Sequence, residues 1–169
     1  MRISDLTNPL GPVRGALLLL RRDATLGTIA ETLAGVYGDR RVVEQDRDGL
    51  TLTYREAAAL VDRWAGGIAA RVAPGERVVI ATPNGYEQIL LCLAAARAGA
   101  IAAPVNAEMR ADEIRHVEQD CDAALTIRDP AEVADRDPLG TAHPAAAGDS
   151  AALFYTSGTT GKPCLLYTS

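Results

Sequence analysis

Lysine is almost missing from this chain, because Lys162 is the only lysine among 17 basic residues in 169 positions. Aromatic residues make up only 4% of the sequence, so a base-stacking platform for nucleic acid is not expected. The net charge is −5 and the arginines are scattered rather than clustered. This charge pattern argues against a general nucleic-acid binder or membrane-surface binder.

Cysteine and histidine are also sparse. Cys92, Cys121 and Cys164 show no C-x-x-C spacing, and an odd number of thiols is typical of reduced cysteines in a cytoplasmic protein. The two histidines, His116 and His143, are far apart in the sequence. We therefore expect no metal site built from these side chains.

Long hydrophobic runs are lacking too. The apolar run at residues 16–20 is too short for the core of a secretion signal, and Arg21 and Arg22 follow it immediately. No run approaches the roughly 18 apolar residues that a membrane span needs. With 48% hydrophobic and 23% charged residues, the composition is that of a globular protein. We expect residues 1–24 to form an irregular lead-in with a short helix at residues 15–22, in a protein located in the cytoplasm.

Strand and helix patterns alternate in the middle of the chain. Apolar strand candidates at residues 77–81, 100–105 and 123–127 are separated by helix candidates, one ending at Arg97 and one at 111–120. Alternation with short connections predicts parallel strands with helices packed on the faces of the sheet, an α/β fold. The first of these helices is apolar over much of its surface, so we expect it to be largely buried.

A proline-rich segment follows this unit. Residues 128–149 contain three prolines and two glycines. This composition predicts a linker with at most one helical turn.

Before this unit, a hairpin is predicted between two helices. Apolar residues at helical spacing over 25–37 predict the first helix. Two β-rich runs, 41–44 and 50–53, surround an Asp-Gly pair, which is a strong hairpin signal.

Two pairs of residues have the spacing of a helix capping box. Thr53 with Glu56 opens the second helix, and Asn84 with Glu87 has the same spacing before the helix that ends at Arg97. Trp64 lies on the apolar stripe of the second helix. At that spacing we expect it to pack in the core rather than to stack on a ligand.

The segment from Tyr155 to Pro163 reads YTSGTTGKP and follows an apolar run directly. Glycines let backbone N–H groups converge, hydroxyls add donors, and the lysine adds a compact charge, so the segment could hold phosphate. Composition alone favours an ordinary surface turn. The segment also departs from the common nucleotide loop G-x-x-x-x-G-K-[ST], because Gly158 and Gly161 are too close together and Pro163 replaces the hydroxyl residue.

The same nine residues resemble the signature loop of the adenylate-forming superfamily, which includes acyl-CoA synthetases, aryl-CoA ligases, luciferases and peptide-synthetase adenylation domains. Three earlier elements resemble this family in the same order. They are L-T-Y-R-E at 52–56, R-V with P-N within 77–84, and R-A-G-A with P-V-N within 97–106. The resemblance implies that residues 25–163 form part of the family's N-terminal AMP-binding domain.

The resemblance also implies a reaction and its participants. The implied enzyme is an ATP-dependent carboxylic acid–CoA ligase, which forms an acyl-adenylate and then a thioester. ATP, Mg²⁺ and coenzyme A are the implied cofactors, and a fatty or aromatic acid is the implied substrate. The segment P-V-N at 104–106 is closer to the CoA ligases than to adenylation domains, which usually carry an acidic residue at position 106. In the family, this loop binds the ATP phosphates, which here implies Thr156, Ser157, Gly158, Thr159, Thr160, Gly161 and Lys162.

Two features depart from the family pattern. Cys164 and Leu165 stand where the family has Lys or Arg followed by Gly, and the chain ends at Ser169, before the family's acyl pocket and catalytic lysine. We therefore expect a truncated N-terminal fragment that is inactive alone, with no catalytic residue assigned. Residues 164–169 match one reading frame of a transposon end used in sequencing libraries, so we interpret them as a non-native tail.

Three other functions remain open from the residues. The chain could be an α/β module that binds a nucleotide or phosphate without turnover. It could belong to the adenylation domain of a peptide synthetase. It could also be a structural domain whose Ser/Thr/Gly segment is only a turn.

Overall fold

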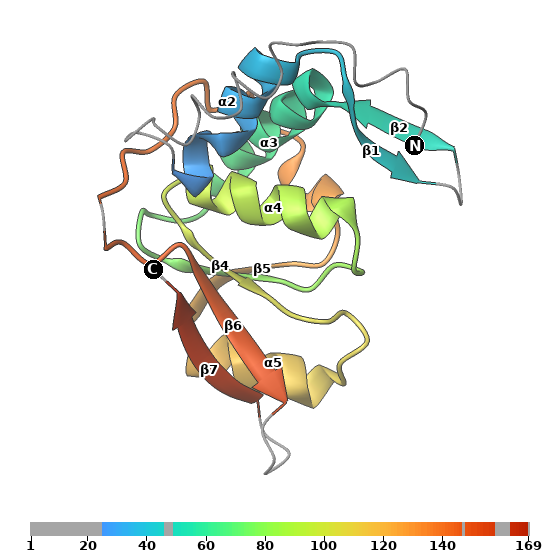
Figure 1. Cartoon of the computed structure of the whole chain (residues 1–169). Coiled ribbons are helices and arrows are strands. Elements are labelled where there is room, and N and C mark those ends of the chain that lie inside the picture. Colours follow the sequence, from blue (N-terminus) through green and yellow to red (C-terminus); the bar gives the residue numbers. More distant parts are fainter. Residues whose placement is uncertain (1–24, 46–48, 147, 158–162, 169) are drawn as a thin grey trace.

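The computed structural model describes residues 25–45, 49–146, 148–157 and 163–168. The short helix predicted at residues 15–22 lies outside them. The described residues form an α/β fold with a largely parallel sheet, as the alternating pattern predicts (Figure 1).

The main sheet has five strands in the order β5-β3-β4-β6-β7. The first four strands in this order are parallel to one another, and β7 runs antiparallel to β6. The strands are β3 (Arg77–Ile80), β4 (Ile101–Pro104), β5 (Ala123–Ile127), β6 (Ala152–Ser157) and β7 (Pro163–Thr168).

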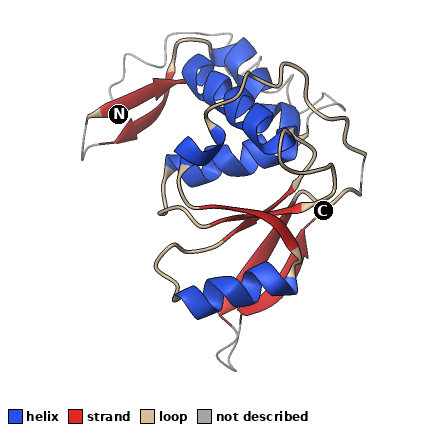
Figure 2. Cartoon of the chain, turned by 180° about the vertical axis from the view of Figure 1, so that it is seen from behind, coloured by secondary structure: helices blue, strands red, loops and turns tan. Residues whose placement is uncertain are grey.

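Helices cover both faces of this sheet. Three of them, α2 (Leu26–Tyr37), α3 (Tyr54–Ala69) and α4 (Tyr86–Arg97), lie on one side, and α5 (Ala111–Asp120) lies on the other (Figures 1 and 2). Because successive residues of a strand point to opposite faces, β3 contributes side chains to the hydrophobic clusters on both faces of the sheet. Val78 and Ile80 pack in the cluster that contains residues of α3 and α4, whereas Val79 packs with Ile114 and Val117 of α5.

A separate hairpin precedes α3. Strands β1 (Arg41–Gln45) and β2 (Leu50–Thr53) pair antiparallel, which confirms the prediction from the Asp-Gly pair. The capping box is also confirmed, because the Glu56 backbone N–H donates to Oγ1 of Thr53 at 3.2 Å and Oε2 of Glu56 accepts from the Thr53 N–H at 2.8 Å. Trp64 is buried in the core, as predicted.

The second predicted capping box is wrong. Helix α4 starts one residue later than the box requires, so Gly85 is its N-cap, with an extended backbone and no side-chain cap. The carboxylate of Glu87 instead accepts a hydrogen bond of 3.3 Å from the Tyr86 hydroxyl. The burial expected for α4 holds for Leu90 and Leu91, but Ile89 of the same helix is 64% exposed.

The linker after β5 contains a single 3-10 turn, η2 (Pro130–Val133), as predicted. It packs closely on α3, since a Cβ at Gly67 would overlap the Val133 carbonyl oxygen. Among the described residues, no helix has the length and apolar character required to cross a membrane.

Candidate functional site

The parallel strands place their carboxyl ends at one edge of the sheet. Ligands of open α/β sheets bind outside this edge. Strand β6 ends there at Ser157, directly before the Ser/Thr/Gly segment, and β7 returns from it at Pro163. The register pairs Ser157 with Pro163 and Thr156 with Cys164. The two ends of the segment therefore lie next to each other in this structure, and the pairing involves residues 164–168, which belong to the segment that we interpret as a non-native tail.

The predicted phosphate-binding residues divide into two groups. Thr156 and Ser157 lie on β6, where the structure describes their backbone. The remaining members lie outside the described residues; they are Gly158, Thr159, Thr160, Gly161 and Lys162. Their contact with phosphate therefore stays a prediction.

Gln88, in the first turn of α4, ties two loops together at this edge. Its Nε2 donates to the carbonyl oxygen of Thr82 at 3.1 Å and to that of Val105 at 2.9 Å. Thr82 follows β3 and Val105 follows β4, so one side chain fixes the spacing of the two loops. Just beyond, Oδ1 of Asn106 accepts from the Glu108 N–H at 3.0 Å, which forms a turn after β4.

Thr82 also carries a polar atom without a partner. Its side chain is fully buried, and among the described residues its Oγ1 has no hydrogen-bond partner. Buried hydroxyls nearly always have a partner in protein or water.

Tyr155 anchors β6 to the opposite layer. Its hydroxyl donates to Oδ2 of Asp120 at 3.0 Å, and its ring packs against the core cluster that includes Val117 and Leu153. Burial, followed by the hydrogen bond to Asp120, raises the pKa of Tyr155 well above its ordinary value. Tyr155 therefore remains protonated and serves as a neutral anchor for the strand that leads into the candidate loop.

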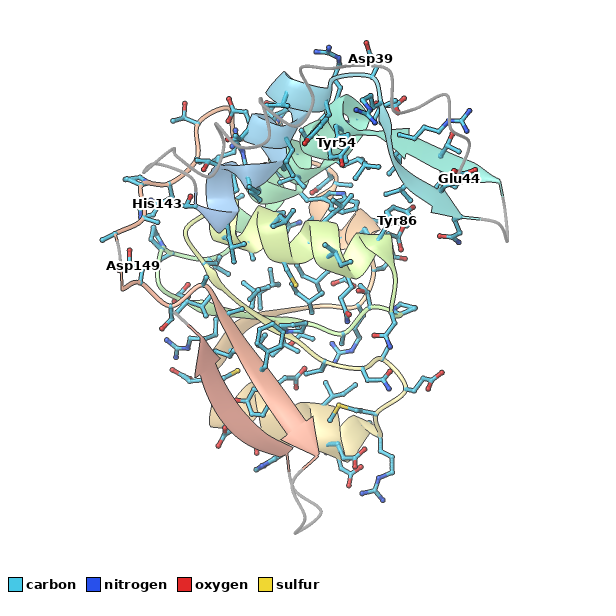
Figure 3. The ribbon with its side chains drawn as sticks, viewed as in Figure 1. Asp39, Glu44, Tyr54, Tyr86, His143 and Asp149 are labelled. Carbon is cyan, nitrogen blue, oxygen red and sulfur yellow. The ribbon has the colours of Figure 1, made fainter. Side chains whose placement is uncertain are left out.

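A cavity of about 530 Å³ opens at a different place, near the amino ends of the strands. Its lining includes Gly75, Gly99, His143 and Asp149. In Figure 3, His143 and Asp149 lie on one side of the molecule and Tyr86, at the start of α4, lies on the other. Thr156 and Ser157 are not among the described residues that line this cavity.

The hydrogen-bond donors in the sequence of the candidate loop match the chemistry of ATP phosphates. Hydroxyls, backbone N–H groups and one ammonium suit the negative charge of a phosphate chain. Within the described ranges, there is no group of three or more His, Cys, Asp or Glu side chains arranged to hold a metal ion. We therefore assign no magnesium ligand among these residues.

Thr82 and Gln88 were not predicted from the sequence. The available signal was a polar residue at the start of an apolar helix that directly follows a buried strand. Its partners are backbone carbonyls on two different loops, and such carbonyls leave no mark in a sequence pattern.

The profile of the family described as AMP-binding enzyme matches residues 30–144. The chain belongs to this family.

Individual relatives agree with this assignment. The chain is 34% identical to a medium/long-chain-fatty-acid–CoA ligase, FadD6, of Mycobacterium tuberculosis, over 89% of this chain and 31% of the relative. It is 31% identical to a feruloyl-CoA synthase of Amycolatopsis, over 68% of this chain and 28% of the relative. The chain thus spans about a third of the length of these curated relatives.

A solved structure shares the fold. The inhibitor-bound N-terminal domain of FACL13 from Mycobacterium tuberculosis superposes with a TM-score of 0.69 at 27% identity. The match covers 85% of this chain and 44% of that domain.

Proposed function

We propose that this chain is the N-terminal part of an ATP-dependent carboxylic acid–CoA ligase, in which residues 156–162 bind the β- and γ-phosphates of ATP. The observation that carries the proposal is the position of this segment. It begins where β6 ends, at the carboxyl edge of the sheet, in a chain of the AMP-binding family.

The chemistry of the segment fits the first half of the reaction. Attack of a carboxylate on the α-phosphate releases pyrophosphate, so negative charge accumulates on the departing group. Positioned donors and a cation stabilise such charge, and Mg²⁺ would share this role when bound. Thr156, Ser157, Thr159 and Thr160 supply hydroxyls, and Lys162 supplies the ammonium. Gly158 and Gly161 would allow the backbone to approach the phosphates closely.

The acid is proposed to be a fatty or aromatic one, with coenzyme A as the thiol acceptor. Support comes from the two similar ligases, one described as acting on medium and long-chain fatty acids and one as a feruloyl-CoA synthase. Asn106, in place of an acidic residue, also favours the CoA ligases over the adenylation domains. Three cysteines without C-x-x-C spacing fit a cytoplasmic enzyme.

The chain alone is proposed to be inactive. It spans about a third of the length of the similar ligases. The described residues contribute the anchors of β6, the strand that leads into the proposed phosphate loop, and we assign none of them to the adenine, to the acid or to thioester formation. These tasks require residues that the longer enzyme would supply.

ATP–pyrophosphate exchange tests the proposal. A longer enzyme containing this segment should catalyse exchange in the presence of its acid, and the 169-residue chain should not. Exchange by the chain alone would contradict its inactivity. Saturable ATP binding by a longer protein without exchange would instead identify a binding module. Transfer of the acyl group to a carrier protein rather than to coenzyme A would identify an adenylation domain.

A further inference from the structure

Residues 134–146, which we name the strap, run from η2 back across the helices toward β6. The strap is fastened to two helices by backbone hydrogen bonds. The Leu139 N–H donates to the Asp62 carbonyl oxygen of α3 at 3.1 Å, and the His143 N–H donates to the Arg97 carbonyl oxygen of α4 at 2.9 Å. The Gly140 N–H also reaches Oδ1 of the Asp62 side chain at 3.1 Å.

Arg97 lies at the centre of these contacts. Its side chain is only 5% exposed although it is charged. Its Nε donates to Oδ1 of Asp62 at 2.7 Å, and its Nη2 donates to the Gly140 carbonyl oxygen at 3.0 Å. Its Nη1 donates to Oε2 of Glu31 at 3.0 Å and to the Gly27 carbonyl oxygen at 3.3 Å. One guanidinium therefore joins α2, α3, α4 and the strap.

The charge of Arg97 is well supported in this buried position. Burial lowers its pKa, but the hydrogen bonds and charges of Asp62 and Glu31 raise the pKa above its ordinary value. A buried cation is tolerated when carboxylates and carbonyls compensate the loss of water. The planar fork of arginine can reach several acceptors at once, which a lysine ammonium cannot do in the same geometry.

Gly99 belongs to the same arrangement. Its φ of +81° favours glycine, and a Cβ there would lie 2.6 Å from the imidazole ring of His143. The strap therefore binds the side chain of Arg97 through Gly140, and its His143 packs against Gly99, where a side chain would not fit.

Residues 147–151 connect the strap to β6, which starts at Ala152. Strand β6 meets β4 at the pair Ala102–Ala152, and the Ala102 N–H donates to the Ala151 carbonyl oxygen at 3.3 Å. The beginning of β6 is therefore held against β4, a few residues after the strap ends.

We propose that Arg97 is a positioning residue for the strand that leads into the phosphate-binding segment: by clamping the strap onto α3 and α4, it fixes the path of β6 and so the position of its last residues, Thr156 and Ser157. The role in ATP binding rests on the proposed function, whereas the mechanical coupling between Arg97, the strap and β6 does not.

Two variants of the Arg97 partners separate the clamp from general stability. Asp62→Asn weakens the acceptor shared by Arg97 and Gly140, and so loosens the strap. Glu31→Gln is the matched control, because it changes another carboxylate bound to Arg97 that does not contact the strap. Asp135→Asn is a second control, since Asp135 lies on the strap but pairs with Arg71 at 3.3 Å on the surface.

Amide hydrogen exchange on the 169-residue chain measures the coupling. In Asp62→Asn we expect the amide exchange rates of both the strap and β6 to rise by about tenfold or more, because a charge-assisted hydrogen bond is lost. We expect a smaller rise in both control variants. An increase limited to the strap, or an equal increase in the controls, would overturn the proposal. If Asp62→Asn does not fold, Arg97→Lys replaces it and is judged in the same way.

The unmodified chain gives an independent check. The amides of Gly140 and His143 should exchange more slowly than those of Thr141 and Ala142, and equal rates would contradict the clamp. In the longer enzyme, Asp62→Asn should raise the KM for ATP severalfold with a smaller change in kcat. An unchanged KM for ATP in an active enzyme would refute the positioning role. If the unmodified longer enzyme shows no ATP–pyrophosphate exchange, the proposed function fails. The amide hydrogen-exchange result still decides the coupling between Arg97, the strap and β6.

Discussion

The hydroxyl of Tyr155 donates a hydrogen bond of 3.0 Å to Oδ2 of Asp120. This contact connects the strand that enters the candidate loop with the last residue of α5, on the other face of the sheet from α4. The first residue of the YTSGTTGKP segment is therefore an anchor of β6.

Replacing Tyr155 by Phe should destabilise the fold by about 1 kcal/mol, because a hydrogen bond is lost while the ring is kept. Urea unfolding of the chain would measure the difference. Tyr37→Phe is the matched control, since the Tyr37 ring packs against the ring of Tyr54 at a centroid distance of 4.9 Å, and this contact does not depend on its hydroxyl. Equal effects of the two changes would argue against the anchor.

Two glycines in helices should respond to alanine in opposite directions. A Cβ at Gly67 would overlap the Val133 carbonyl oxygen of η2, so Gly67→Ala should cost about 2 kcal/mol through overpacking. Gly35 in α2 has open space around a Cβ, so Gly35→Ala should stabilise by about 0.5–1 kcal/mol. Thermal unfolding would show both effects, and a stabilising Gly67→Ala would contradict the packing of η2 on α3.

Glu56 should make stability depend on pH in the acid range. The hydrogen bonds from the Thr53 backbone and side chain lower the pKa of Glu56 below 4.5 in the folded chain. The stability that ionised Glu56 contributes is therefore fully present above the pKa of Glu56 in the unfolded chain. It is lost as the pH falls through the lower pKa of the folded chain. Glu56→Gln should flatten this part of the stability profile. Glu44→Gln on β1 is the control and should leave this part of the profile unchanged. An identical profile for the unmodified chain, Glu56→Gln and Glu44→Gln would refute the prediction.

The thiol of Cys92 should be almost inert in the folded chain. Burial raises its pKa from 9.0 to about 11. At pH 8 the thiolate population is then about a hundredfold smaller than for an unperturbed thiol. Because the thiolate is the reactive form, the rate of alkylation should fall by a similar factor. Alkylation followed by peptide mapping, in buffer and in urea, would measure the ratio. Equal labelling rates in the two conditions would contradict the burial of this side chain.

Lys162→Ala should weaken ATP–pyrophosphate exchange in a longer enzyme by about tenfold to a hundredfold, because a positioned cation stabilises the charge on pyrophosphate. Arg63→Ala removes one positive charge from the exposed face of α3 and serves as the control. Equal activity of Lys162→Ala and the unmodified enzyme would remove this lysine from the phosphate site.

Much of the fold could be predicted from local patterns. The Asp-Gly pair and its flanking runs predicted the β1–β2 hairpin, and Thr53 with Glu56 predicted the start of α3, because each of these signals acts within a few residues. The same kind of signal failed at Asn84 and Glu87. There the chain must first close the loop after β3, and α4 begins one residue too late for Asn84 to be its N-cap.

The candidate site was predicted through its composition and its resemblance to a family. Hydroxyls, glycines and the lone lysine concentrate in residues 155–163, and this concentration is visible in the sequence. Its support by Tyr155, Thr82 and Gln88 is not visible there. Tyr155 and Asp120 are 35 residues apart, and Gln88 binds carbonyl groups that every residue type possesses.

The sequence by itself determined the order of strands and helices, the family pattern and the residues offered to phosphate, because these depend on local spacing and side-chain chemistry. The tertiary structure alone decided that Arg97 of α4 and Asp62 of α3 meet at 2.7 Å and hold the strap before β6. The physical reason is that a buried charge must find its partners, and these come from whichever distant segments the packing brings to it.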